Sequence, residues 1–181
     1  IEPGELSEIA RVRGQALAAG AAAQLHERTQ GWAAGLVLML EHAKISGRIA
    51  SLPGDAPPQA VFDYLAGEIF QHFEPATREF LLRIACLPRM TARVAESISG
   101  EAMAGRLLVN LAQNNYFVSE ANSDEGRVFQ LHPLLRDFLR GRAAETLPEA
   151  FGASHLKRAA DLLREAGQIE DAVALLVECR D

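Results

Sequence analysis

The sequence of 181 residues lacks every short motif that would mark a self-contained enzyme. It has no GxxxxGKS/T phosphate loop, no GxGxxG fingerprint, no GxSxG nucleophile elbow and no HExxH zinc motif. Carboxylate pairs such as Asp124 with Glu125, or Glu170 with Asp171, fall in polar turns or on helix surfaces, where solvation or charge at a helix N-terminus explains them. We therefore expect that this chain is not an enzyme, and we assign these carboxylates no role.

Cysteines and long apolar runs are also scarce. The two cysteines, Cys86 and Cys179, lie far apart and have no CxxC or histidine spacing, which indicates packing residues in a reducing compartment and no metal site. The longest apolar stretch, residues 32–40, is shorter than the roughly 20 residues that span a bilayer, and no signal peptide opens the chain. We expect a cytoplasmic protein without membrane contact.

An excess of positive charge is missing as well, since 18 Lys and Arg stand against 24 Asp and Glu, a formal charge of -6. Within residues 75–145 there are nine Lys or Arg and eight Asp or Glu, whereas a domain that neutralises several phosphates should be more basic. This balance predicts no direct DNA binding by this fragment. Arg136, Arg140 and Arg142 are then interpreted as a solvated or interdomain face.

What the sequence does have is enough apolar content, 49%, to bury a core, arranged mainly at helical spacing. Apolar positions at i, i+3, i+4, i+7 and i+8 predict a helix over 102–114 and another from about 133 to 145. Between them, 116–118 and 128–131 are β-prone runs separated by a polar turn over 121–126. Further helices are predicted near 76–87 and 91–98. This order of helices and one hairpin is typical of a winged helix, in a mainly α chain.

Composition divides the chain into four parts. Residues 1–50 are alanine-rich and predict a small helical subdomain, while 51–59 hold three prolines and a glycine and predict a linker. Residues 60–146 are expected to form the winged-helix domain with a leading helix. Residues 147–181 predict two amphipathic helices around Gly167, which resemble one tetratricopeptide-type pair. A single pair cannot bury its face alone, so we expect the chain to be a fragment of a longer protein.

His132 is the first candidate for a binding residue. Pro133 fits the first position of a helix, which places His132 at or near the N-cap. A helix N-terminus favours anions, and a neighbouring imidazole can donate a further hydrogen bond to a phosphate oxygen. The spacing alone fits more simply a histidine that caps the helix and packs against the wing, so both interpretations stay open here.

The second candidate is the segment 31–36, in which two glycines flank the only tryptophan near a helix start. Small residues allow close backbone approach, so a planar group such as an adenine could pack there. A tight helix junction with Trp32 as a core anchor is the simpler interpretation of the spacing.

Three runs together resemble the middle of MalT-type, LuxR-family transcriptional regulators of the STAND class of signal-transducing NTPases. They are ERTQGWAAGL over 27–36, FLLRIACL over 80–87 and FQLHPLLRDFL over 129–139. The resemblance covers nearly all of the chain, and the order and intervals of the runs make the set more specific than any one of them.

The resemblance implies an N-terminal ATPase core with a P-loop, a helical lid, a winged helix, a tetratricopeptide-like sensor and a C-terminal DNA-binding domain. By this resemblance the chain would correspond to the lid, the winged helix and the start of the sensor, so its partners would be the other domains of the same protein. ATP or ADP would be bound by the full-length protein, and none is expected to be tightly bound to this fragment. Self-association on activation is also implied.

The resemblance also implies which residues would contact nucleotide. In related STAND proteins the lid's glycine-proline motif lies against the adenine, and a winged-helix histidine contacts the β-phosphate of ADP. By position His132 would supply the phosphate contact. The residues that would face the adenine are Gly31, Trp32, Ala33 and Gly35, with alanine at 33 where many STAND lids carry proline.

The expected function is therefore the regulatory middle region of an ATP-dependent transcriptional regulator, which couples nucleotide state and inducer sensing to DNA binding elsewhere in the protein. The alternative is a nucleotide-independent adaptor, whose winged helix and helical repeat bind another protein. A P-loop upstream of this chain in the parent protein would discriminate against the adaptor.

Overall fold

The computed structural model describes residues 58–114, 117–123 and 126–178, together with Met39 and His42. The chain divides into two compact units, residues 1–73 and residues 74–181, and each is considered by itself. Apart from Met39 and His42, the helical subdomain expected over residues 1–50 lies outside the described residues.

In the first unit, helix α4 (Pro58–Gln71) is the one complete element described. Its buried residues recur at helical spacing along one face: Phe62, Leu65, Ala66 and Ile69. Near its end, the His72 ring contacts the carbonyl of Glu68 at 2.8 Å. The compact units divide after residue 73. Our expectation that this helix leads the winged-helix domain stays a prediction.

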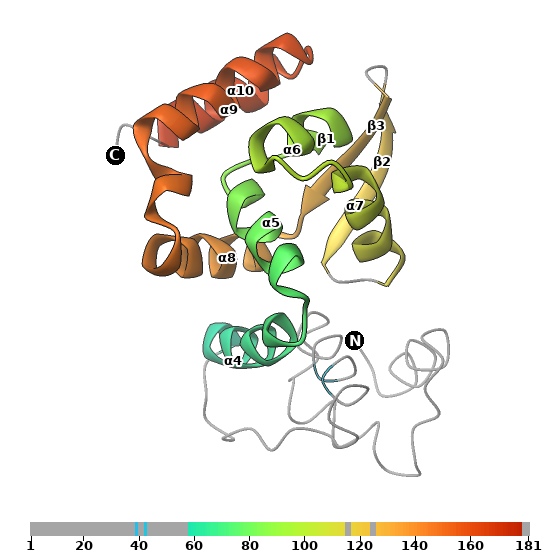
Figure 1. Ribbon diagram of the computed structural model, residues 1–181, viewed down its shortest axis with the longest axis vertical. Coiled ribbons are helices and arrows are strands. Elements are labelled where there is room, and N and C mark those ends of the chain that lie inside the picture. The colour runs from blue at the N-terminus through green and yellow to red at the C-terminus, as the bar shows by residue number, and fades with distance from the viewer. Residues whose placement is uncertain (1–38, 40–41, 43–57, 115–116, 124–125, 179–181) are drawn as a thin grey trace. The chain divides into compact units, whose positions relative to one another are not determined.

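The second unit begins with a winged helix (Figure 1). Its elements, in chain order, are α5 (Pro75–Ile84), β1 (Met90–Thr91), α6 (Ala92–Ser99), α7 (Ala104–Gln113), β2 (Val118–Ser123), β3 (Gly126–Leu131) and α8 (Pro133–Thr146). The three strands form an antiparallel sheet in the order β1-β3-β2. The expected winged helix in a mainly α chain is confirmed.

Strand β1 is missing from the sequence prediction. It contains two residues, Met90 and Thr91, which pair with Phe129 and Val128 of β3. Two residues are too few to show the alternation of apolar and polar positions that identifies a strand. The strand forms because β3 supplies its hydrogen-bonding partner.

The wing is also longer than expected. Residues 121–123 belong to β2 and Gly126 already pairs with Ser123, so the turn that we placed over 121–126 is much shorter. All of β2 after Val118 is exposed, and its residues therefore show no apolar alternation. Cross-strand pairs stabilise the ribbon instead, among them an ion pair of 3.0 Å between Arg127 and Glu120.

The core of the winged helix lies where α6 and α7 pack on the sheet and α5 packs against α6. Large side chains with almost no exposed surface come from α5 and β3, chiefly Phe80, Leu81, Ile84 and Phe129. Helix α6 is capped at both ends. The Thr91 hydroxyl accepts a hydrogen bond from the Val94 N–H at 3.3 Å, and Gly100 ends the helix with a φ of 75°.

A helix pair completes the second unit. After a short 3-10 turn (Pro148–Phe151), α9 (Ala153–Glu165) and α10 (Ile169–Glu178) pack against each other around Gly167, as the sequence predicts. The small residues Ala159 and Ala160 and the larger Leu163 are buried on α9, and this helix packs against α6. The tetratricopeptide-like assignment of the pair stays a prediction.

None of the helices in the described ranges is long and apolar enough to cross a membrane.

Candidate functional site at the start of α8

His132 is the N-cap of α8, with Pro133 at the first helical position, as the sequence predicts. Its Nδ1 accepts a hydrogen bond from the backbone N–H of Leu134 at 3.3 Å. Because neutral imidazole carries one proton, this bond assigns the proton to Nε2. His132 therefore caps its own helix and keeps a single ring donor for another group.

The wing holds His132 from the other side. Its backbone N–H donates to the carbonyl of Phe117 at 2.7 Å, and the two rings meet edge to face with centroids 5.6 Å apart. Phe117 has a φ of 58°, in the left-handed region, which costs a bulky side chain about 1 kcal/mol. The contacts with His132 offset this strain at the point where the chain enters β2.

Burial lowers the pKa of His132 from its ordinary value of 6.5, because the partly apolar surroundings disfavour the imidazolium. The side chain is therefore neutral at pH 7, which the acceptor role of Nδ1 requires. Few backbone donors of the first turn remain for an anion, because Pro133 has none and the N–H of Leu134 is bonded to the ring. A phosphate at this end would thus depend mainly on the Nε2–H.

The other expected nucleotide contacts, Gly31, Trp32, Ala33 and Gly35, lie outside the described residues. Their contact with an adenine stays a prediction. That they form one nucleotide site together with His132 is also a prediction.

One turn after His132, Arg136 makes internal contacts that the sequence did not reveal. Its Nε and Nη2 donate to the carbonyls of Ala85 and Cys86, at 3.3 and 3.0 Å. Both of these residues are buried, so their carbonyls need a partner within the protein. We expected Arg136 on a solvated or interdomain face, and instead it is half-buried and caps the chain just after α5.

Asp171 is a second residue whose role the sequence did not reveal. We expected a solvated carboxylate at a helix start, but Asp171 is only 7% exposed. Arg89 donates to both of its oxygens, at 3.0 and 3.2 Å, and Gln168 donates to one of them at 3.3 Å. The first turn of α10 is thereby joined to the segment between α5 and β1.

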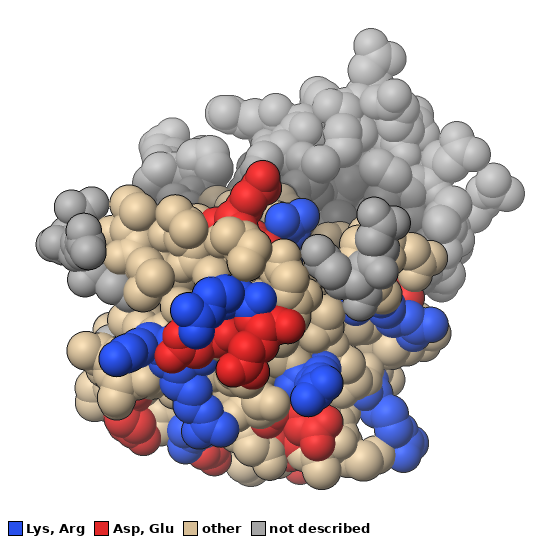
Figure 2. Space-filling view, turned by 90° about the horizontal axis from the view of Figure 1, so that it is seen from above, with Lys and Arg blue, Asp and Glu red and all other residues tan. Residues whose placement is uncertain are grey.

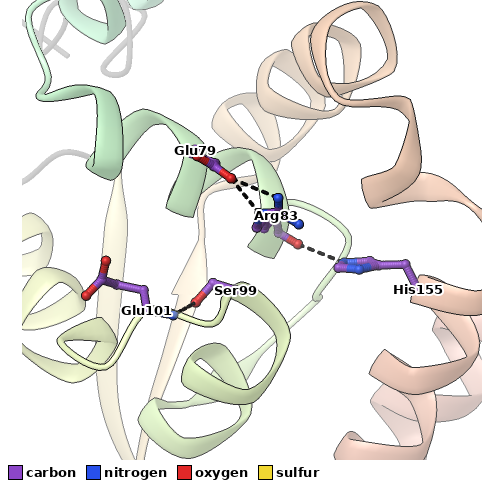
Figure 3. A network of polar contacts seen from close by, with 5 residues as sticks. All are labelled: Glu79, Arg83, Ser99, Glu101 and His155. Atoms are coloured by element: carbon purple, nitrogen blue, oxygen red, sulfur yellow. Dashed lines mark hydrogen bonds and ion pairs between the residues drawn. The ribbon is translucent and has the colours of Figure 1, made fainter.

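Two further hydrogen bonds join α9 to the winged helix. Figure 3 shows the His155 ring facing the carbonyl of Arg83 at the end of α5, with Nε2 3.2 Å from that oxygen, while the guanidinium of Arg83 binds Glu79. The Nη2 of Arg158 donates to the carbonyl of Ser97, the residue near the end of α6, at 2.8 Å. Burial is the main cause that lowers the pKa of His155 from 6.5.

An open groove of about 590 Å³ lies along α7, at the position of the recognition helix in DNA-binding winged helices. The exposed side chains of α7 that line it include Arg106, Asn110 and Gln113. The other arginine of the groove, Arg127, is paired with Glu120. In Figure 2 the basic and acidic side chains alternate over the visible face and form no continuous basic band among the residues drawn in colour.

Among the described ranges, no group of three or more His, Cys, Asp and Glu is placed to hold a metal ion.

Comparison with known proteins agrees with this architecture. Residues 66–151 match the MalT winged helix domain family. The chain is 30% identical over 127 residues to the HTH-type transcriptional regulator MalT of Serratia proteamaculans (strain 568), an alignment that covers 66% of this chain and 14% of that protein. Fold and sequence together thus define a winged-helix domain of the MalT type over residues 66–151. This part of the chain is therefore similar to MalT-type regulators, and the chain spans about 14% of the length of the relative that it matches.

Proposed function

We propose that this chain is the regulatory middle of an ATP-dependent transcriptional regulator, in which ADP favours a closed packing of lid and winged helix on an ATPase core. ATP and inducer would then favour an open arrangement that self-associates and binds DNA through another domain. The match to a MalT winged-helix domain supports the assignment to a regulator, and the dependence on nucleotide is the proposed step.

The geometry of His132 is the observation that carries this proposal. A neutral imidazole whose Nδ1 is already bonded presents its Nε2–H as a donor of defined orientation, which fits a phosphate oxygen. The ring contacts the Leu134 N–H through Nδ1 and the Phe117 ring edge to face, and the backbone N–H of His132 is bonded to the Phe117 carbonyl. Such preorganisation reduces the entropy that binding would otherwise cost.

The chain's own contribution to the switch is a difference in affinity between two arrangements. A ligand shifts a conformational equilibrium only by the difference in its binding free energy for the two states. His132 would contact the nucleotide only while the winged helix is packed on the core. ADP when bound supplies the phosphate charge that this contact needs.

The exposed apolar face of α10 supports the proposal that further helical repeats of a sensor domain follow this helix pair. Four apolar side chains on this helix are 46–59% exposed and recur at i, i+4, i+7 and i+8: Ile169, Val173, Leu176 and Val177. Contiguous exposed apolar surface of this kind marks an interaction site. We propose that another helix pair of the longer protein covers this face, as in a stacked repeat.

The same face would also suit the second candidate function, a nucleotide-independent adaptor. In that case a separate protein would cover α10, and His132 would have only its capping role. A P-loop upstream in the parent protein would favour the regulator over the adaptor.

The proposal is tested in the full-length protein with His132→Ala. We expect this variant to release ADP faster and to activate transcription without inducer. Unchanged ADP retention with unchanged basal activity would contradict the proposed role of His132.

A further inference from the structure

The segment from Arg83 to Arg89, here called the connector, contains the last two residues of α5 and the chain that leads to β1. Its first half is held through three backbone carbonyls. Those of Ala85 and Cys86 accept from Arg136 of α8, and that of Arg83 accepts from His155 of α9. The last carbonyls of a helix have no partner within the helix. Apart from the Cys86 thiol, 3.7 Å from the Arg83 oxygen, the donors here are side chains of two other elements.

The other end of the connector is held by an ion pair. Arg89 binds Asp171 in the first turn of α10, and the carboxylate has a side-chain exposure of only 10%. Between the two ends, Ala85, Cys86 and Leu87 have at most 1% exposure. A buried segment of this kind cannot shift at one end without disturbing its packing at the other.

His132 lies one helical turn before Arg136. The backbone N–H of Arg136 donates to the carbonyl of His132 at 2.9 Å, so both residues belong to the same first turn of α8. In the view of Figure 1, α5 lies between α8 and the pair α9–α10. The connector therefore touches both the turn that carries His132 and the helix pair that follows the winged helix.

We propose that the connector mechanically couples the start of α8 to the α9–α10 pair, so that displacement of the pair loosens the turn that presents His132. Arg136 and Arg89 are the two positioning residues of this coupling. Its regulatory meaning rests on the proposed function, because only then does loosening of His132 weaken a nucleotide contact. The coupling itself requires no nucleotide.

The physical cause is the cost of unpaired buried groups. If α9–α10 moved away, Asp171 would lose Arg89, and the carbonyl of Arg83 would lose His155. The connector would then relax, and the bonds from Arg136 to Ala85 and Cys86 would lose their geometry. The first turn of α8 would consequently open more often.

The test is amide hydrogen exchange, followed by NMR on the 181-residue chain without nucleotide, in wild type and Asp171→Asn. Asparagine keeps the shape of the side chain and removes its charge. We expect the amides of Arg136 and Asp137 in α8 to exchange roughly three to thirty times faster in this variant. The amides of Val128 and Phe129 in β3 report global opening, and they should change less.

Asp161→Asn is the matched control, because Asp161 lies on α9 and pairs with Arg164 on the surface, away from the connector. This variant should leave exchange in α8 within about twofold of wild type. The reciprocal variant is Arg136→Lys, which keeps the positive charge but cannot donate to the carbonyls of Ala85 and Cys86 through two guanidinium nitrogens. It should accelerate amide exchange in α10.

Acceleration restricted to α9 and α10 in Asp171→Asn would overturn the coupling, as would acceleration in α8 no larger than in β3. Because nucleotide is absent, these outcomes are independent of whether ADP binds. A coupled connector in a protein that binds no ADP would contradict only the proposed function.

Discussion

Arg89 and Asp171 are 82 positions apart in the sequence, and their side chains meet with an N–O distance of 3.0 Å. The arginine belongs to the winged helix and the aspartate to the helix pair that follows it. This ion pair, together with the contacts of His155 and Arg158, makes the two parts one compact unit.

The first prediction concerns the energy of this ion pair. Arg89→Ala leaves the buried carboxylate of Asp171 with the single donor that Gln168 provides, so we expect the free energy of unfolding to fall by about 2 kcal/mol. Arg164→Ala, which removes the exposed pair with Asp161, should cost less than about 0.5 kcal/mol. Urea unfolding measures both, and equal costs would contradict the assigned role of Arg89.

The second prediction separates the capping role of His132 from any role in binding. His132→Ala removes the acceptor for the N–H of Leu134 and should cost about 1 kcal/mol of stability. His132→Asn supplies another N-cap acceptor and should stay within about 0.5 kcal/mol of wild type. If both variants unfold at the same urea concentration, the Nδ1 contact does not stabilise α8.

The third prediction concerns Arg136. Arg136→Ala leaves the buried carbonyls of Ala85 and Cys86 without this donor, and we expect a loss of about 2–3 kcal/mol. Arg142→Ala is the control on the same helix. The Arg142 side chain is partly exposed. It pairs with Glu145 at 3.8 Å, and its guanidinium lies 5.8 Å from the centre of the Phe138 ring, so its removal should lower the free energy of unfolding by only about 0.5 kcal/mol. A small effect at Arg136 would contradict its capping of the connector.

The fourth prediction concerns pH. The pKa values of His132 and His155 both lie below 6.5 in the folded protein, mainly because of burial, so the unfolded chain takes up protons first. Stability from the neutral rings is present above about pH 6.5 and is lost as the pH falls through the folded pKa values. The urea midpoint should therefore drop on acidification. A variant with His132→Asn and His155→Gln should show a smaller drop, whereas an unchanged drop would exclude these two histidines as its cause.

Much of the fold is predictable because its helices are amphipathic. Apolar spacing gave α7 and α8 within a few residues, and Pro133 placed His132 at the N-cap. Strand β1 could not be predicted, because two residues such as Met90 and Thr91 have no periodicity. The exposed strand β2 likewise has no buried face that would mark it.

The tertiary contacts of the polar residues were not predictable. Acidic residues in the first turn of a helix have the same sequence pattern whether they are solvated, as Glu170 is, or buried, as Asp171 is. The partner that decides between them, Arg89, is distant in the sequence. Arg136 lies on the half-buried part of α8, and its long side chain reaches the carbonyls after α5, which no local sequence pattern reveals.

The most direct test of the central claim is calorimetric titration of ADP into the longer protein that includes the upstream ATPase core. Wild type would be compared with His132→Ala and with His132→Asn, which keeps the cap. The account predicts tight ADP binding that both substitutions weaken, because each removes the Nε2–H while only the first removes the cap. Absence of ADP binding, or equal affinity in all three proteins, would contradict it.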